Sequence, residues 1–184
     1  MPMENPRSLL IANRGEIAIR IANAAASLGL RSVAVCSVDD QENLHLLKAD
    51  KSIVLPGRGP SGYLDMEAIV ATAVAEKCDM IHPGYGFLSE NADFARLCEQ
   101  YGIAFVGPSS EVLQLFGDKV AARNLAISLD VQVPRGTVGE TTLEEAQAFF
   151  ASLGEGGVAM IKAVAGGRAR HASCSVGFGI ARSL

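Results

Sequence analysis

The chain has 184 residues and a formal net charge of −4, with 49% hydrophobic and 20% charged residues. This share of apolar residues supports a packed core and is not typical of disordered chains. The acidic balance and the scattered Lys and Arg residues argue against a nucleic-acid partner and against a membrane-surface patch. The apolar stretches are too short for a membrane span.

The N-terminus and the cysteines indicate the cell compartment. Residues Met1–Ser8 lack the basic region, apolar core and small-residue cleavage site of a secretory signal. Cysteines occur at Cys36, Cys78, Cys98 and Cys174, and no pair has C-x-x-C spacing. We therefore expect ordinary thiols in a reducing cytoplasm, without a cysteine metal site.

The first part of the chain alternates between predicted strands and helices. Residues 9–12 form an apolar run, residues 16–28 have apolar side chains at helical spacing, and residues 32–37 again favour a strand. The next predicted elements are a short helix at 45–49, a strand at 51–55, a loop at 57–62, a helix at 65–77 with Asp65 as N-cap, a strand at 80–81, a helix at 91–101 and a strand at 103–106. Such alternation predicts an α/β fold, a Rossmann-like, mainly parallel sheet with helices on both faces.

The pattern changes after Gly107-Pro108. Helices are predicted at 109–116, 118–129 and 143–153, an extended segment at 131–136 and a strand at 158–162. We expect a domain boundary near residues 107–110.

Two predicted loops follow strands and therefore lie where open α/β sheets bind ligands. The first motif, Ala12–Ala18, reads A-N-R-G-E-I-A and is either an anion-binding helix start or simply a tight turn. The second motif, Ile81–Asn91, reads I-H-P-G-Y-G-F-L-S-E-N and presents an imidazole, a phenol and a carboxylate. Two alternatives stay open, Ser89 as a helix N-cap and His82 as a core histidine.

Two further motifs contain lysines. Lys119 lies within Phe116–Ala122 at a predicted helix start, where it could contact a phosphate or be simply solvated. Lys162 ends an apolar strand and is followed by Gly166 and Gly167, an arrangement suited to nucleotide phosphates. Neither a Walker P-loop nor a G-x-G-x-x-G fingerprint is present.

The four motifs, in this order, resemble the biotin carboxylase family from about Leu9 to Gly167. The resemblance implies an N-terminal Rossmann-like domain at 7–108 and the truncated start of an ATP-grasp domain at 109–167. It also implies a reaction in which ATP, divalent metal (Mg or Mn) and bicarbonate carboxylate biotin on a biotin carboxyl carrier protein or domain. A carboxyltransferase then passes the carboxyl group to a final acceptor, and the full-length enzyme is a homodimer.

The resemblance also implies roles for particular residues. Lys119, Lys162, Gly166 and Gly167 match positions at the ATP site, Tyr85 and Gly86 match the biotin side, Glu90 and Tyr85 lie near the biotin and bicarbonate site, and Arg20 matches the dimer interface. The metal-binding and principal catalytic residues of the family lie downstream of the matched motifs. No metal site is therefore expected in this chain, and no complete catalytic set.

The resemblance breaks off after Gly167. The family continues with a glycine-rich lid, whereas this chain continues Arg168-Ala169-Arg170-His171-Ala172. One permitted set of codons for these residues encodes Gly-Arg-Gly-Met-Arg when read from its second base, which is the family's lid. We therefore expect residues 168–184 to be an out-of-frame tail, and the chain alone to be inactive with little or no ATP binding. The alternatives are a different ATP-grasp ligase, a nucleotide-dependent dehydrogenase, or a non-catalytic fragment that self-associates or docks on a carboxylase.

Overall fold

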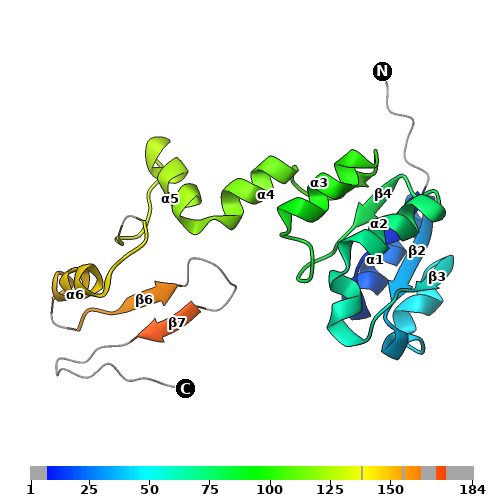
Figure 1. The fold of residues 1–184 in the computed structure, drawn as a ribbon, viewed down its shortest axis with the longest axis horizontal. Helices are drawn as coiled ribbons and strands as arrows, with labels where there is room; N and C mark the ends of the chain where they lie inside the picture. The colour runs from blue at the N-terminus through cyan, green and yellow to red at the C-terminus, as the bar shows by residue number, and fades with distance from the viewer. Residues whose placement is uncertain (1–7, 138, 155, 163–168, 173–184) are drawn as a thin grey trace. The chain divides into compact units, whose positions relative to one another are not determined.

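The computed structural model describes residues 8–137, 139–154, 156–162 and 169–172 (Figure 1). The chain divides into two compact units, Met1–Gly117 and Asp118–Leu184, and each is described by itself. Helix α4 (Ser110–Gly117) belongs to the first unit because it packs against α3 (Ala92–Gln100). The domain limits expected at 108 and 109 stay a prediction.

The first unit is built on a parallel sheet with the strand order β3-β2-β1-β4-β5. The α/β, Rossmann-like fold predicted from the alternating pattern is confirmed. The strands and helices are β1 (Ser8–Ile11), α1 (Gly15–Ser27), β2 (Arg31–Cys36), β3 (Lys51–Val54), α2 (Met66–Ala75), β4 (Met80–His82), α3 (Ala92–Gln100), β5 (Ala104–Phe105) and α4 (Ser110–Gly117). Three 3-10 helices complete the unit at Val38–Asp40, Leu44–Lys48 and Gly59–Leu64.

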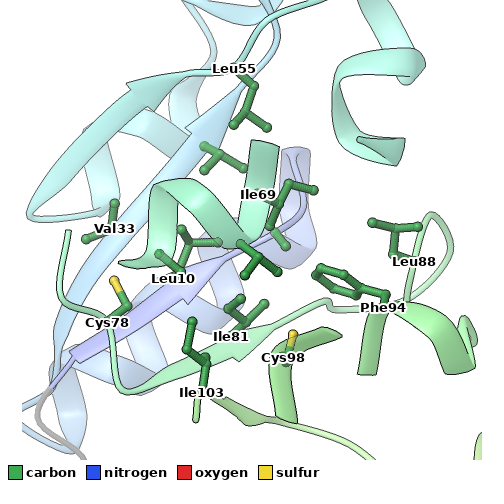
Figure 2. Packing of buried hydrophobic residues seen from close by; sticks show 14 of the residues in the cluster. Leu10, Val33, Leu55, Ile69, Cys78, Ile81, Leu88, Phe94, Cys98 and Ile103 are labelled. Atoms are coloured by element: carbon green, nitrogen blue, oxygen red, sulfur yellow. The ribbon is translucent and has the colours of Figure 1, made fainter. Parts of the chain in front are cut away.

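Successive residues of a strand point to opposite sides of the sheet. Both sides of β1 carry apolar side chains, and helices cover both faces of the sheet. Leu9 and Ile11 of β1 pack with the apolar side of α1. Leu10 belongs to the other core, which also contains Ile69 of α2 and Phe94 of α3 (Figure 2). The fully buried central strand explains why residues 9–12 read as a continuous apolar run rather than an alternating one.

Local capping signals fix most helix starts. The Asp65 carboxylate accepts a hydrogen bond from the Ala68 N–H and caps α2, as predicted. The cap of α3 is Asn91, whose side-chain oxygen accepts from the Phe94 N–H at 2.8 Å. The alternative of Ser89 as N-cap is therefore wrong, because the chain still turns before it enters the helix at Ala92.

The loop predicted at 57–62 differs from the structure. A 3-10 helix spans Gly59–Leu64 with a proline in its first positions, and it carries the fully buried Tyr63. Glycine and proline content predicted only a turn-rich loop, because a single 3-10 turn has no apolar period of its own. Burial of the Tyr63 ring against the sheet selects the helical turn.

The described cysteines behave as core residues. Cys36, Cys78 and Cys98 are free and buried. Burial raises the pKa of each thiol, that of Cys78 to about 11, which keeps the thiols protonated and unreactive. Cys174 lies outside the described residues. Within the described part of the chain, no helix is both long and apolar enough to cross a membrane.

The described residues of the second unit form two helices and a two-stranded ribbon. Helix α5 (Lys119–Ser128) is capped by Asp118, and α6 (Leu143–Ala151) begins with a capping box formed by Thr142 and Glu145. Strand β6 (Ala159–Lys162) pairs antiparallel with β7 (Ala169–Ala172). The sequence pattern predicts no strand at β7. Strand β7 lies within the expected out-of-frame tail, residues 168–184, whose other residues lie outside the described part of the chain, as do Gly166 and Gly167.

A buried histidine joins the 3-10 helix Leu44–Lys48 to the sheet. His45 is 1% exposed, and its Nε2 lies 3.3 Å from the Val35 carbonyl oxygen. Its Nδ1 has no hydrogen-bond partner among the described residues. Burial lowers the pKa of His45, and this effect outweighs the hydrogen bond to the Val35 carbonyl and the charge of Asp40, which both raise the pKa. The folded chain therefore holds this imidazole neutral.

We expect acid to destabilise the chain partly through His45. The unfolded chain gains a proton on this side chain as pH falls through its ordinary value of 6.5, and the folded chain does not. The free energy of unfolding should therefore be lower at about pH 5.5 than at about pH 7.5, as measured by urea unfolding. His45→Gln should reduce this pH dependence, and an unchanged slope in the variant would contradict the assignment. His82, whose pKa burial also lowers, should account for part of the remaining slope.

The core predicts a second stability effect. Phe94 is fully buried and its ring meets Phe105 edge-on at 5.8 Å, so Phe94→Ala should lower the free energy of unfolding by about 3–5 kcal/mol. Phe116 is 60% exposed, and Phe116→Ala should change the free energy of unfolding by no more than about 0.5 kcal/mol. Urea unfolding followed by circular dichroism measures both values. Equal losses of stability in the two variants would contradict the placement of Phe94 in the core.

Candidate functional site

The first two sequence motifs lie side by side at the carboxyl edge of the sheet. Strands β1 and β4 are parallel neighbours, with Ile11 paired to His82. The Ala12 N–H donates to the His82 carbonyl oxygen at 2.9 Å and extends this pairing past the strand end. The two chain segments therefore leave the sheet together, in the place where open α/β sheets bind ligands.

Asn13 ties the second motif to the end of β1. Its side-chain Nδ2 donates to the carbonyl oxygens of Pro83 at 2.6 Å and Tyr85 at 2.9 Å. Its Oδ1 accepts from the Arg14 N–H at 2.8 Å. The side chain is 3% exposed, so these bonds satisfy a polar group that would otherwise be buried without partners.

Two glycines of the second motif have the left-handed backbone conformation for different reasons. Gly84 has φ +67°, and a Cβ there would lie 2.8 Å from Asn13 Nδ2 and 3.1 Å from Ile17 Cγ1. Gly86 also has φ +67°, but a Cβ there would meet no atom within 4 Å. Gly84 therefore allows the close approach to Asn13, whereas Gly86 is needed only for its backbone turn.

Tyr85 lies between these glycines and reaches back to the first motif. Its side chain is 61% exposed, and its hydroxyl donates to Glu16 Oε1 at 2.5 Å. The hydrogen bond to Glu16, together with the charge of the carboxylate, raises the pKa of Tyr85. The phenol therefore keeps its proton to a higher pH than an ordinary tyrosine, while the residue remains exposed to solvent.

Arg14 holds the far side of the same loop. Its guanidinium is 5.6 Å from the Tyr63 ring centre and 5.8 Å from that of Phe87, two rings that stack at 5.1 Å. Its NH1 also donates to Asp40 Oδ2 at 3.0 Å. A cation over two aromatic faces and beside a carboxylate fixes Phe87, the residue that follows Gly86.

Asp40 and Tyr63 complete this cluster beneath Arg14. The Tyr63 hydroxyl donates to Asp40 Oδ2 at 2.8 Å. Burial raises the pKa of Tyr63, and the bond to Asp40 raises it further. Burial opposes ionisation of Asp40, but hydrogen bonds from Tyr63 and Arg14 outweigh it, so the pKa of Asp40 is lowered. Arg14 thus faces a carboxylate that stays charged at neutral pH.

His82 has a role in the loop backbone. Its Nδ1 accepts a hydrogen bond from the Gly84 N–H at 3.0 Å, which places its ring proton on Nε2. Burial lowers the pKa of His82, so the ring is neutral when it accepts this bond. The alternative of a satisfied, structural histidine fits these contacts.

The other predicted site residues are spread over the chain. Glu90 is exposed near the end of the second motif, and Arg20 is exposed on α1. Lys119 is exposed in the first turn of α5, in the second unit. The backbone of Lys162 ends β6, whereas Gly166 and Gly167 lie outside the described residues. Among the residues that the structure describes, no group of His, Cys, Asp and Glu side chains could hold a metal ion.

The sequence pattern alone does not single out the residues that hold Tyr85 and Phe87. Asn13, Arg14 and Glu16 were quoted only as parts of the first motif, and Asp40 and Tyr63 were not singled out. The available signal was position, because polar residues directly after one buried strand face the loop after a neighbouring strand. Recognising their partners required the strand order.

The two glycines give a matched prediction. Gly86→Ala should lower the free energy of unfolding by about 1–2 kcal/mol, the cost of a left-handed alanine. Gly84→Ala should cost more, because the added Cβ also displaces the Asn13 amide from its hydrogen bonds. Urea unfolding of the two variants makes the comparison, and a cost for Gly84→Ala no larger than that for Gly86→Ala would contradict the close contact.

Comparison with known proteins shows the family of the first unit. Residues 5–113 match the family model described as "Biotin carboxylase, N-terminal domain". The chain is 49% identical over 167 residues to a pyruvate carboxylase of Staphylococcus aureus, which covers 90% of this chain and 14% of that protein. It is 44% identical over 163 residues to a biotin carboxylase of Pseudomonas aeruginosa, covering 88% of this chain and 36% of that protein.

Solved structures agree in fold. The biotin carboxylase domain of a single-chain bacterial carboxylase has 53% identity and a TM-score of 0.79, covering 82% of this chain and 35% of that one. A second structure is the biotin carboxylase domain dimer of the Hydrogenobacter thermophilus 2-oxoglutarate carboxylase, in complex with MgADP, ADP and bicarbonate. It has 38% identity and a TM-score of 0.83, and the match covers 89% of this chain and 36% of that chain. The chain thus spans between 14% and 36% of the length of these relatives, and it belongs to the biotin carboxylase family, whose N-terminal domain it contains.

Proposed function

We propose that this chain is the N-terminal part of a biotin carboxylase and that it supplies the biotin side of the active site. The observation that carries the proposal is the loop at the carboxyl edge of the sheet, in which Tyr85 and Gly86 are exposed while Asn13 and Arg14 hold their neighbours. An exposed functional segment on a rigidly held backbone is the usual arrangement of a binding loop. Glu90, exposed in the same segment, lies at the bicarbonate side in this proposal.

We further propose that the second unit begins an ATP-grasp domain. Lys119 at the start of α5 and Lys162 at the end of β6 would neutralise ATP phosphates, and Gly166 and Gly167 would begin the loop that covers them. The bound MgADP and bicarbonate of the Hydrogenobacter thermophilus domain support this ligand set. The ligands of the Mg or Mn ion, the carboxyphosphate chemistry and the lid belong to family segments beyond Gly167.

The partners follow from the same family. A biotin carboxyl carrier protein or domain would present biotin to Tyr85, and a carboxyltransferase would receive the carboxyl group. The exposed Arg20 on α1 would belong to a homodimer interface, a proposal supported by the dimer among the related structures. The related proteins carry names for different acceptors, including pyruvate and 2-oxoglutarate, so the acceptor is left open. A cytoplasmic location is part of the proposal.

The chain alone is proposed to be inactive. With ATP, magnesium, bicarbonate and free biotin, the purified chain should release no ADP above a blank, because the groups that align ATP with bicarbonate lie downstream. Bicarbonate-stimulated ADP release by the pure chain would overturn this part of the proposal. Sequencing the encoding DNA tests the origin of residues 168–184, because a one-base shift should restore the glycine-rich lid.

A chimera tests the function itself. Residues 8–162 should replace the aligned segment of the Staphylococcus aureus pyruvate carboxylase, and the chimera should keep biotin-dependent ATP cleavage. In that chimera, Lys119→Gln should raise KM for ATP by about tenfold or more, the loss expected for a charged phosphate contact. Lys48→Gln, at an exposed lysine of the 3-10 helix Leu44–Lys48, is the control and should have no effect. A folded but inactive chimera would argue against the assignment.

A further inference from the structure

The proposed function assigns no role to the Glu16 side chain of the first motif, Ala12–Ala18. Its Glu16 carboxylate accepts the hydroxyl proton of Tyr85, across 69 positions of sequence. We propose that Glu16 is a positioning residue that turns the hydroxyl proton of Tyr85 inward, so that the Tyr85 oxygen meets a ligand as a hydrogen-bond acceptor. This inference rests on the proposed function and names the ligand group that Tyr85 recognises, an N–H donor such as the ureido group of biotin.

The hydroxyl of Tyr85 has one proton to give. A phenol donates a single hydrogen bond and accepts through its oxygen lone pairs. The 2.5 Å bond to Glu16 Oε1 commits that proton, and a bond to a carboxylate is among the stronger ones available to it. Tyr85 is 61% exposed as a residue, so an incoming group can approach its side chain from solvent.

The backbone on both sides of Tyr85 is already fixed. Asn13 Nδ2 holds the carbonyl oxygens of Pro83 and of Tyr85 itself. Arg14 lies over the ring of Phe87, two residues further on. Three nearly consecutive residues of the first motif therefore determine where the Tyr85 ring and its hydroxyl lie before any ligand arrives, which lowers the ordering cost of binding.

This arrangement selects the chemistry of the ligand group. An N–H of a cyclic urea can donate to the Tyr85 oxygen and complete its hydrogen bonding. A carboxylate or a urea carbonyl oxygen would instead face a lone pair next to the Glu16 charge, and would be repelled. The raised pKa of Tyr85 is consistent with this, since loss of the phenol proton would place two negative charges side by side.

The first test measures the positioning by Glu16. Ultraviolet titration of the purified chain should show a tyrosine whose pKa is above the ordinary 10.0, assigned to Tyr85 by its absence in Tyr85→Phe. Glu16→Gln should shift that pKa down towards 10.0. Glu67→Gln is the matched control, because Glu67 is also a first-turn acid, in α2, and it should leave the titration unchanged. An unchanged Tyr85 titration in Glu16→Gln overturns the proposal.

The second test measures the acceptor role with small probes. Biotin and 2-imidazolidinone, which carry ureido N–H groups, should shift the Gly86 amide resonance of the 15N-labelled chain. 1,3-Dimethyl-2-imidazolidinone, which has no N–H, should not, and Glu16→Gln should weaken 2-imidazolidinone binding by about two- to tenfold. Equal binding of the dimethyl compound overturns the acceptor role. If no urea binds while the Tyr85 titration still responds to Glu16→Gln, the positioning by Glu16 is supported and the proposed biotin side fails.

Discussion

The buried amide of Asn13 is the interaction on which the candidate site depends. It lies where the parallel strands β1 and β4 end together, and it donates to two carbonyl oxygens of the loop after β4. A buried amide without hydrogen-bond partners would lower the stability of the fold. The two loop carbonyls satisfy the Asn13 amide, and the amide in turn fixes the loop backbone. Gly84 permits this approach because a Cβ in its place would collide with the amide.

Exposure of Tyr85 and Gly86 follows from that fixed backbone. Tyr85 and Gly86 can face solvent because the loop is fixed on both sides of them. Asn13 donates to the Pro83 carbonyl, and the Arg14 guanidinium lies over the Phe87 ring. The Arg14 charge is in turn balanced by Asp40, which Tyr63 also contacts. At this edge of the sheet, a polar cluster whose hydrogen bonds are satisfied can thus take the place of apolar packing and leave the loop with Tyr85 exposed.

The regular elements of the first unit could be predicted because their signals are local. The continuous apolar run of β1, the helical spacing of α1 and the Asp65 cap of α2 each depend on a few neighbouring residues. The missed features depend on distant contacts. Burial of Tyr63 selects a 3-10 turn where composition predicted a loop, and β7 is a strand through its pairing with β6. A strand partner cannot be read from four residues of mixed polarity.

The sequence by itself determined the fold class, the family and the loop that carries Tyr85. The signals for these are local, because the strand and helix patterns and the four ordered motifs each depend on residues that are neighbours in the chain. Only the tertiary structure decided which residues hold that loop. Glu16 meets Tyr85 across 69 positions and Asn13 meets Pro83 across 70. Such contacts follow from the neighbouring positions of β1 and β4 in the sheet, and strand order is set by the packing of the whole unit rather than by either motif.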